Sequence, residues 1–304
     1  MDYEVAVIGA GPGGLVSSLY LRRFLRRTIL LSAGPPRASW IPKTHNLFGF
    51  RDGVSGVQLL KQLQGQLDDL GIERAVGQYR VSKSRGGFRV QGESGESFTA
   101  KKVILATGMT DVQPLVGNLD LLRRRGLLRY CPVCDAFEYR DKKIVVLAQD
   151  DHGLKTARFL SRFTDSIQVL WPPSQPLPMR LVKTCMREKV KFTRGILKSV
   201  VEPKGKGTGL AITYVDADQT QREMKADACY VALGITVNDF AFRSLKGIER
   251  GEGGYLITGS HQEIKKIPGL FAVGDCVEGL AQIATAAGQA AVAATRIHNE
   301  LRAP

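Results

Sequence analysis

The stretch that decides the fold lies near the start of the chain and reads Val5-Ala6-Val7-Ile8-Gly9-Ala10-Gly11-Pro12-Gly13-Gly14. Its first four residues form a short apolar run, which is typical of a buried parallel strand. An apolar-periodic segment from Leu15 to Leu25 predicts a helix, and the apolar run Thr28–Leu31 predicts the next strand. Strand, glycine-rich turn, helix and strand in this order indicate a dinucleotide-binding βαβ unit.

Each glycine of the turn has a predicted role. Gly9 permits the tight turn after the strand, Gly11 lets the backbone approach a diphosphate, and Gly14 allows the helix to pack closely on the strand. The diphosphate would bind at the helix start, beside Pro12, where unpaired amides and the helix dipole favour negative charge. The acid expected to bind the adenosine ribose is absent from Leu31-Ser32-Ala33-Gly34. We interpret this absence as weakened ribose selectivity and not as loss of the site.

The pattern of Val5–Phe24 recurs at Ile144–Phe163, so the chain contains an internal repeat. A length of 304 residues also suggests about two domains. Because features of the first domain reappear near the C-terminus, we expect an α/β fold with two Rossmann-like dinucleotide-binding domains, the second inserted in the first. The boundaries are predicted near residues 112 and 240. The predicted segments are 1–112, 113–240 and 241–304.

Later segments indicate that the first domain binds FAD and not NAD. Lys102–Gly108 has the form of the crossing segment in flavoproteins with two dinucleotide domains. Gly269–Asp275 resembles the segment of such proteins in which the acid, here Asp275, hydrogen-bonds a ribityl hydroxyl and the preceding glycine, here Gly274, lets the flavin chain pass. Gln282–Gly288 then begins a helix of small residues, whose N-terminus would favour an anionic reduced flavin. For Asp275 alone, the alternative interpretation is a helix cap.

The pair Cys131 and Cys134 is followed directly by Asp135. The two-residue gap lets the sulfurs close a disulfide at the start of a helical turn, where the dipole lowers a thiol pKa. A zinc site would need two further ligands, and the chain has no second CxxC and no His-x3-5-His, so we predict no metal. Inert buried thiols are the other alternative, and redox chemistry is the interpretation we favour. The remaining cysteines, predicted as small buried hydrophobic residues, are Cys185, Cys229 and Cys276.

Taken together, these motifs occur in the order and spacing of low-molecular-weight thioredoxin reductases, which the chain resembles over nearly its whole length. The motifs are the glycine turn, Ala106-Thr107-Gly108, Cys131-xx-Cys134-Asp135, Val231-Ala232-Leu233-Gly234-Ile235 and Val273-Gly274-Asp275. Asn46-Leu47-Phe48-Gly49-Phe50 also resembles the segment of that family beside the flavin.

The resemblance implies an FAD domain interrupted by a smaller domain that carries the cysteine pair. It also implies a homodimer, and a rotation between domains that presents the disulfide alternately to the flavin and to a protein disulfide such as that of thioredoxin. By this analogy Cys134 faces the flavin, Cys131 attacks the target disulfide and Asp135 moves protons. The expected flavin-binding residues are Gly9, Gly11, Pro12, Gly14, Asn46, Ala106, Thr107, Gly108, Gly274, Asp275, Gln282 and Ile283.

The second glycine turn departs from the family. Ala148 and Asp150 stand where the repeat has Gly9 and Gly11. Asp150 would face a diphosphate, and like charges about 4 Å apart repel by about 1 kcal/mol in water and about 4 kcal/mol at an effective dielectric of 20. In these reductases the next strand leads to a His-Arg-Arg cluster for the 2′-phosphate of NADPH, but here no cation precedes Arg180. We therefore predict that NADPH does not bind.

Electrons would then come from another donor, as in the pyridine-nucleotide-independent branch of these reductases, which is linked to ferredoxin or to a second flavin. An acidic ferredoxin would suit the net charge of +14. A second FAD would have Trp171 as a stacking surface, but Asp150 and Asp151 disfavour its diphosphate, so we favour the protein donor. The alternatives are an ordinary NADPH-dependent thioredoxin reductase with an atypical nucleotide site, and a flavin redox sensor that is not an enzyme.

The composition is that of a globular protein, with 43% hydrophobic and 24% charged residues. No run approaches the roughly 18 apolar residues of a membrane-spanning helix, and the first residues lack the features of a secretory signal. We expect a cytoplasmic protein without a membrane partner. The basic excess, 43 against 29 residues, favours an acidic protein partner, and no nucleic-acid-binding motif is present. Arginine clusters predicted as solvated helix faces are Arg22, Arg23, Arg26, Arg27 and Arg123–Arg125.

Overall fold

The computed structural model describes residues 1–202 and 209–302 and divides the chain into two compact units. The first unit contains residues 1–39, 56–110 and 236–304, and the second contains residues 40–55 and 111–235. The chain passes between them four times, through η1 (Arg37–Trp40), before α2 (Gly56–Asp69), and through each of the paired strands β7 (Met109–Asp111) and β16 (Ile235–Val237). The domain boundaries near residues 112 and 240 stay predictions, because compactness alone does not define a nucleotide-binding domain.

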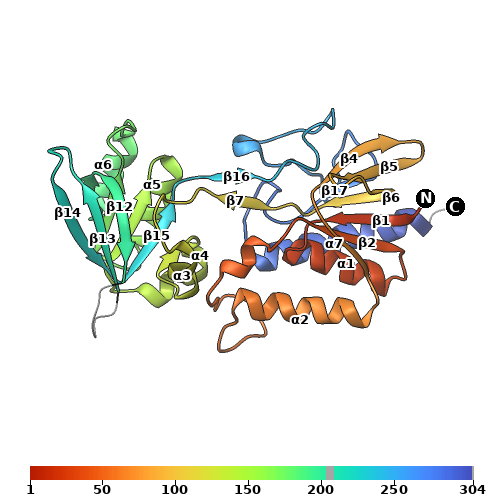
Figure 1. Ribbon diagram of the computed structural model, residues 1–304, viewed down its shortest axis with the longest axis horizontal. Helices are drawn as coiled ribbons and strands as arrows, with labels where there is room; N and C mark the ends of the chain where they lie inside the picture. Colours follow the sequence, from red (N-terminus) through yellow and green to blue (C-terminus); the bar gives the residue numbers. More distant parts are fainter. Residues whose placement is uncertain (203–208, 303–304) are drawn as a thin grey trace. The chain divides into compact units, whose positions relative to one another are not determined.

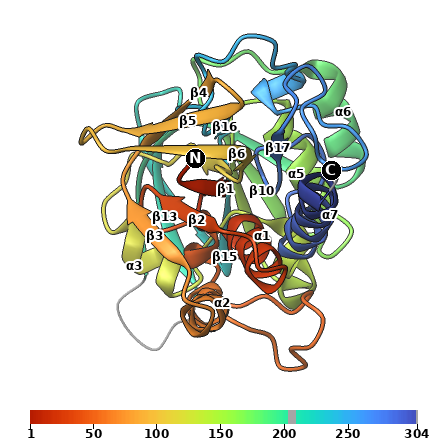
Figure 2. The same ribbon diagram turned by 90° about the vertical axis from the view of Figure 1, so that its right-hand side faces the viewer.

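The first unit is built on a sheet with the order β3-β2-β1-β6-β5-β4, to which β17 adds by pairing with β6 (Figure 1). Strands β1, β2, β3, β6 and β17 run parallel, and β4 and β5 are antiparallel. Helices α1 and α7 lie side by side against the sheet, and α2 packs on α1 (Figure 2). The further elements of this unit are β1 (Tyr3–Ile8), α1 (Pro12–Arg23), β2 (Thr28–Ser32), β3 (Glu73–Val76), β4 (Tyr79–Ser84), β5 (Gly87–Gly92), β6 (Ser97–Leu105), η3 (Glu252–Gly254), β17 (Leu270–Ala272) and α7 (Ile283–Arg302).

The second unit has a parallel sheet with the order β11-β10-β9-β15-β8 and an antiparallel sheet with the order β12-β13-β14 (Figure 1). Its elements are α3 (Leu119–Arg124), β8 (Leu128–Arg129), α4 (Pro132–Asp135), η2 (Ala136–Tyr139), β9 (Ile144–Ala148), α5 (Asp151–Leu160), β10 (Ile167–Trp171), α6 (Met179–Arg187), β11 (Lys191–Arg194), β12 (Ile196–Val201), β13 (Leu210–Val215), β14 (Gln221–Ala226) and β15 (Ala228–Ala232). Strand β9 and helix α5 repeat the arrangement of β1 and α1, which confirms the predicted internal repeat.

The predicted βαβ unit is confirmed, and the helix boundaries differ from the prediction by a few residues. Helix α1 begins at Pro12 and not at Leu15, because the fixed φ of proline suits the first helical position. It ends at Arg23, since Leu25 takes a left-handed conformation with φ of 60° that the helix cannot include. Both strands of the unit are buried, as their apolar runs require.

The arginine clusters are only partly solvated, which corrects the prediction made for them. Arg22 donates to the carbonyl oxygen of Leu70, and Arg26 forms an ion pair with Glu4 at 2.9 Å. The guanidinium of Arg123 lies over the Trp40 ring, 4.3 Å from its centroid. These contacts join helix ends to distant segments, which a helical pattern in the sequence does not reveal. The exposed members are Arg23, Arg27, Arg124 and Arg125.

Across residues 1–202 and 209–302, no helix combines the length and the apolar composition that crossing a bilayer requires.

The glycine at position 14 gives a test of the packing of α1 against β1. A methyl group there would overlap the carbonyl oxygen of Gly9, so Gly14→Ala is expected to lower the free energy of unfolding by about 1–3 kcal/mol. Gly65→Ala in α2 is the matched control, because a methyl group there meets no atom within 4 Å, and it should stabilise the helix by about 0.5–1 kcal/mol. Thermal or denaturant unfolding measures both. Equal effects of the two substitutions would contradict the packing.

Candidate functional site

The turn between β1 and α1 forms a cradle made of backbone. Gly9 has a φ of 115°, and a side chain at this position would overlap the carbonyl oxygen of Ala106 at the end of β6. A side chain at Gly14 would overlap Gly9 itself. Gly11 is different, because a methyl group there would have only Pro36 near it, at 3.8 Å. The turn is therefore closed on its protein side and has room at Gly11 for a ligand.

The start of α1 is suited to an anion. Gly11 precedes the helix without a side-chain hydrogen bond to its first turn, and the first turn contains no acidic residue. The first amides of a helix and its dipole favour negative charge, so this start fits a diphosphate.

The turn that follows β17 lies beside the glycine turn and contains the acid Asp275. A methyl group at Gly13 would lie 3.7 Å from the Cα of Gly274, so the glycine turn and the segment after β17 are neighbours. The amide of Gly274 donates to Oε1 of Gln289 in α7 at 2.7 Å, which fixes this segment. The next residue, Asp275, follows at the edge of the predicted flavin site.

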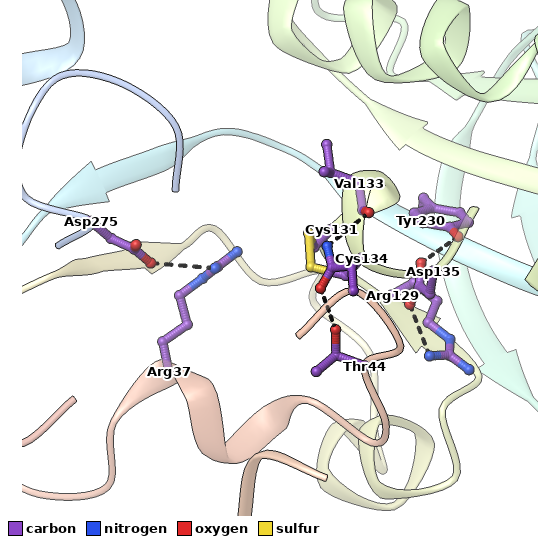
Figure 3. The surroundings of a disulfide bond; sticks show 10 residues. Arg37, Thr44, Arg129, Cys131, Val133, Cys134, Asp135, Tyr230 and Asp275 are labelled. Carbon is purple, nitrogen blue, oxygen red and sulfur yellow. Dashed lines mark hydrogen bonds and ion pairs between the residues drawn. A yellow bond between two sulfur atoms is a disulfide. The ribbon is translucent and has the colours of Figure 1, made fainter. Parts of the chain in front are cut away.

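Asp275 has a cationic partner that the sequence analysis did not single out. Nη1 of Arg37 lies 3.7 Å from Oδ2 of Asp275, and each side chain is 23% exposed (Figure 3). Arg37 is the first residue of η1, which follows β2, and Pro36 directly before it lies near Gly11. The structure therefore pairs a guanidinium with the acid predicted to bind the ribityl chain of the flavin.

The remaining predicted flavin residues of the first unit lie as follows. Ala106, Thr107 and Gly108 continue from β6, and Asn238 holds this segment by donating to the carbonyl oxygens of Thr107 and Gly108 at 2.9 and 3.0 Å. Gln282 immediately precedes α7, which begins at Ile283. The Gln282 carbonyl accepts a hydrogen bond from the amide of Ala286 in the first turn of this helix.

Asn46 belongs to the second unit, whereas the other predicted flavin residues belong to the first. Its Nδ2 donates to the carbonyl oxygen of Val133 at 3.2 Å, and its Oδ1 accepts from the Thr44 hydroxyl at 2.7 Å. The Asn46 side chain therefore joins Thr44 to the loop between the two cysteines. A role of Asn46 toward the flavin stays a prediction.

Cys131 and Cys134 form a disulfide at the start of α4, with their Cα atoms 5.4 Å apart. Pro132 occupies the first helical position, and the amide of Cys134 donates to the carbonyl of Cys131 at 3.1 Å, which folds the loop into a turn. With both sulfurs bonded to each other, the inert-thiol alternative for this pair is excluded. The other cysteines are buried as predicted, and burial raises the thiol pKa of each: Cys185, Cys229 and Cys276.

Asp135, directly after Cys134, is buried within a polar network. Its Oδ2 accepts from Nη1 of Arg129 at 2.9 Å and its Oδ1 accepts from the Tyr230 hydroxyl at 2.6 Å (Figure 3). Nη2 of Arg129 donates to the Tyr139 hydroxyl at 2.6 Å. Burial raises the pKa of the Asp135 carboxyl, although Arg129 and Tyr230 act to lower it. Arg129, Tyr139 and Tyr230 were not identified from the sequence, because three separate elements bring them together.

In the second unit, Asp150 occupies the position that Gly11 has in the first. Each residue directly precedes the first residue of its helix and has extended backbone geometry. Oδ1 of Asp150 accepts from the amide of Gly153 at 3.0 Å, so the carboxylate caps α5. An amide that would hydrogen-bond a phosphate is thereby occupied by the side chain of the chain itself.

Trp171, expected as a stacking surface for a second flavin, is not available for that role. Only 1% of the residue is exposed, and its indole Nε1 donates to the carbonyl of Gln175 at 3.0 Å. The ring packs in the core of the second unit together with residues from β9, α5 and α6. Because the last side chain of the apolar strand β10 is buried, the expectation of a stacking surface at Trp171 is wrong.

Comparison with known proteins agrees with this geometry. The family described as pyridine nucleotide-disulphide oxidoreductase matches residues 3–290. The chain belongs to this family. Thioredoxin reductase of Listeria monocytogenes is 26% identical over 297 residues, covering 96% of this chain and 91% of that protein. Thioredoxin reductase of Bacillus subtilis is 27% identical over 304 residues, covering 98% and 94%.

Among solved structures, the thioredoxin reductase of Streptococcus pyogenes superposes with a TM-score of 0.88, at 24% identity and 98% coverage of both chains, which establishes a common fold. This member of the pyridine nucleotide-disulphide oxidoreductase family is a flavin-dependent disulfide oxidoreductase of the thioredoxin reductase kind, with its disulfide at Cys131 and Cys134. FAD is the cofactor that this family implies, and the backbone cradle, the uncapped start of α1 and Asp275 fit it.

Arg37 allows the flavin site to be tested. Because its guanidinium pairs with Asp275, the acid predicted to bind the ribityl chain, Arg37→Gln is expected to weaken FAD binding to the apoprotein by about tenfold, on the scale of one charge-assisted hydrogen bond. Titration of apoprotein with FAD, followed by flavin fluorescence, measures the change. Arg23→Gln removes the same charge from an exposed site on α1 and should leave the affinity unchanged. Parent-like affinity of Arg37→Gln would exclude a role in binding.

Proposed function

We propose that this protein transfers electrons from bound FAD to the Cys131–Cys134 disulfide and onward to a protein disulfide such as that of thioredoxin, with a donor other than NADPH. The observation that carries the proposal is the contrast between the two helix starts. In the first unit the start of α1 has no side-chain cap, and in the second the Asp150 carboxylate caps α5. A nucleotide diphosphate at α5 would have to displace this carboxylate and then face its charge.

The residues of the disulfide loop have the following proposed roles. When bound, FAD supplies two electrons. Together with two protons these convert the disulfide into two thiols. Cys134 faces the flavin, and the thiolate of Cys131 attacks one sulfur of the target disulfide, which releases the other target sulfur as a thiolate. The Cys134 thiolate then attacks the Cys131 sulfur of the mixed disulfide and displaces the target thiolate, so the Cys131–Cys134 disulfide re-forms and the target leaves as a dithiol. Asp135, buried directly after Cys134, exchanges the protons.

An acidic one-electron donor protein such as ferredoxin is the donor we favour. The net charge of +14 would steer such a partner toward this protein. A second FAD has weaker support, because Trp171 is buried and Asp150 caps the helix start where its diphosphate would bind. The homodimer and the rotation between domains, both implied by the family resemblance, are part of the proposal.

The competing function is an NADPH-dependent thioredoxin reductase, which the family description and the curated relatives favour. Under our proposal, micromolar NADPH added without oxygen leaves the flavin oxidised, as followed by its visible absorbance. Replacing both turn residues, Ala148→Gly with Asp150→Gly, removes the carboxylate and frees the Gly153 amide. Affinity for NADPH is then expected to rise by about one to three orders of magnitude.

The control for this experiment is Asp151→Asn, which removes the neighbouring charge but leaves the cap on α5 intact, so NADPH affinity should change little. Prompt reduction of the parent flavin by micromolar NADPH would refute the proposal in favour of the competing function.

The roles of the two cysteines are tested by a single turnover. Photoreduced parent protein should transfer two electrons to oxidised thioredoxin, counted as new thioredoxin thiols. Cys134→Ser should stay yellow and folded but lose this transfer, and its remaining Cys131 should hold thioredoxin in a stable mixed disulfide. Cys131→Ser should form no such adduct, and Cys185→Ala, which removes a thiol outside the pair, should retain turnover. Turnover by Cys134→Ser would show that the pair is not used.

A further inference from the structure

The residues on either side of the disulfide loop form an ion pair. Arg129 ends β8 two residues before Cys131, and Asp135 follows Cys134 as the last residue of α4. Their ion pair has an N–O distance of 2.9 Å, with 13% of the Arg129 side chain and 9% of the Asp135 side chain exposed. The same short loop is therefore closed twice, once by the disulfide and once by buried charges.

Further contacts fix the geometry of this ion pair. Tyr230 of β15 donates to the carboxylate oxygen that Arg129 does not contact (Figure 3). Arg129 also donates to the Tyr139 hydroxyl of η2. Glu138 is the other charged group that influences Asp135, and it acts in the direction opposite to Arg129. Every member of this network belongs to the second unit.

Breaking a buried ion pair leaves an uncompensated charge and is strongly unfavourable. The pair should therefore persist when the disulfide is reduced and the covalent closure of the loop is lost. We propose that Arg129 is a positioning residue that, through Asp135, keeps the reduced sulfurs of Cys131 and Cys134 close together and thereby sets the midpoint potential of the pair. The inference rests on the proposed function, in which this pair is the redox couple.

The relevant equilibrium is exchange with dithiothreitol. Reduced dithiothreitol gives two electrons and two protons to the protein disulfide, so the Cys131–Cys134 bond breaks, two thiols form, and dithiothreitol closes its own disulfide. Thiols held close together re-form their bond more readily, because less conformational freedom is lost on closure. A loosened loop therefore favours the dithiol and makes the midpoint potential less negative.

The variant that tests this combines Arg129→Met with Asp135→Asn, which removes both charges and leaves neither one unpaired. The exchange equilibrium at pH 7, measured on holoprotein by alkylation of free thiols, is expected to shift about tenfold toward the dithiol. For two electrons this corresponds to about 30 mV. Because the net charge is unchanged, a direct electrostatic effect on the thiolates is small.

The matched control combines Arg158→Met with Glu188→Gln, which removes an ion pair of 2.8 Å that joins α5 to the end of α6 in the same unit. Its midpoint potential should equal that of the parent protein. A parent-like potential in the folded Arg129→Met, Asp135→Asn variant would overturn the inference. That result would not change the outcome expected for the single-turnover test of the proposed electron transfer. Conversely, turnover by Cys134→Ser would refute the proposed electron transfer through the disulfide, but not an effect of Arg129 on the midpoint potential.

A measurement on the parent protein tests the inference even if the double variant does not fold. In the oxidised form the Cys134 amide donates to the Cys131 carbonyl. If the ion pair holds the loop, hydrogen exchange at this amide should stay protected after reduction with excess dithiothreitol. A loss of protection on reduction, with the rest of the second unit still protected, would overturn the proposal.

Discussion

The first unit depends on a close approach of backbone to backbone that only glycine allows. Gly9 lies against the carbonyl of Ala106, and Gly14 lies against Gly9, so the start of α1 contacts the ends of β1 and β6. Any side chain at either position would force the helix away from the sheet. The neighbouring turn at Gly274 then falls beside Gly13. The backbone cradle that fits a flavin diphosphate therefore forms because these glycines have no side chain to separate the helix from the sheet.

The second unit has the same strand-and-helix arrangement as the first, but a carboxylate lies at the start of its helix. Strand β9 and helix α5 match β1 and α1, and Gly153 retains the packing role of Gly14, since a methyl group there would overlap Ala148. The helix start, however, is satisfied from within by the Asp150 carboxylate. The amides and dipole that could bind an anion are thus compensated by the chain itself.

The disulfide lies next to a buried charge pair. Each oxygen of the Asp135 carboxylate has a donor, from Arg129 and from Tyr230, which is what a charged group in a largely buried position requires. These donors come from β8 and β15, two neighbouring strands of one sheet. The sheet therefore provides both the position of the cysteine loop and the compensation of the charge beside it.

The order of local patterns along the chain was enough to predict the βαβ unit, the repeat and the paired cysteines. The apolar run at Val5–Ile8, the glycines after it and the two-residue gap between Cys131 and Cys134 are all properties of neighbouring residues, and local geometry follows from them. The negative charge at Asp150 was also evident, and its position before a helix would have predicted a cap. Only the tertiary structure decided that Arg37 meets Asp275, that Arg129 and Tyr230 meet Asp135, and that Trp171 is buried. Most of these contacts join segments far apart in the sequence, and all of them depend on how strands and loops pack, which no local pattern encodes.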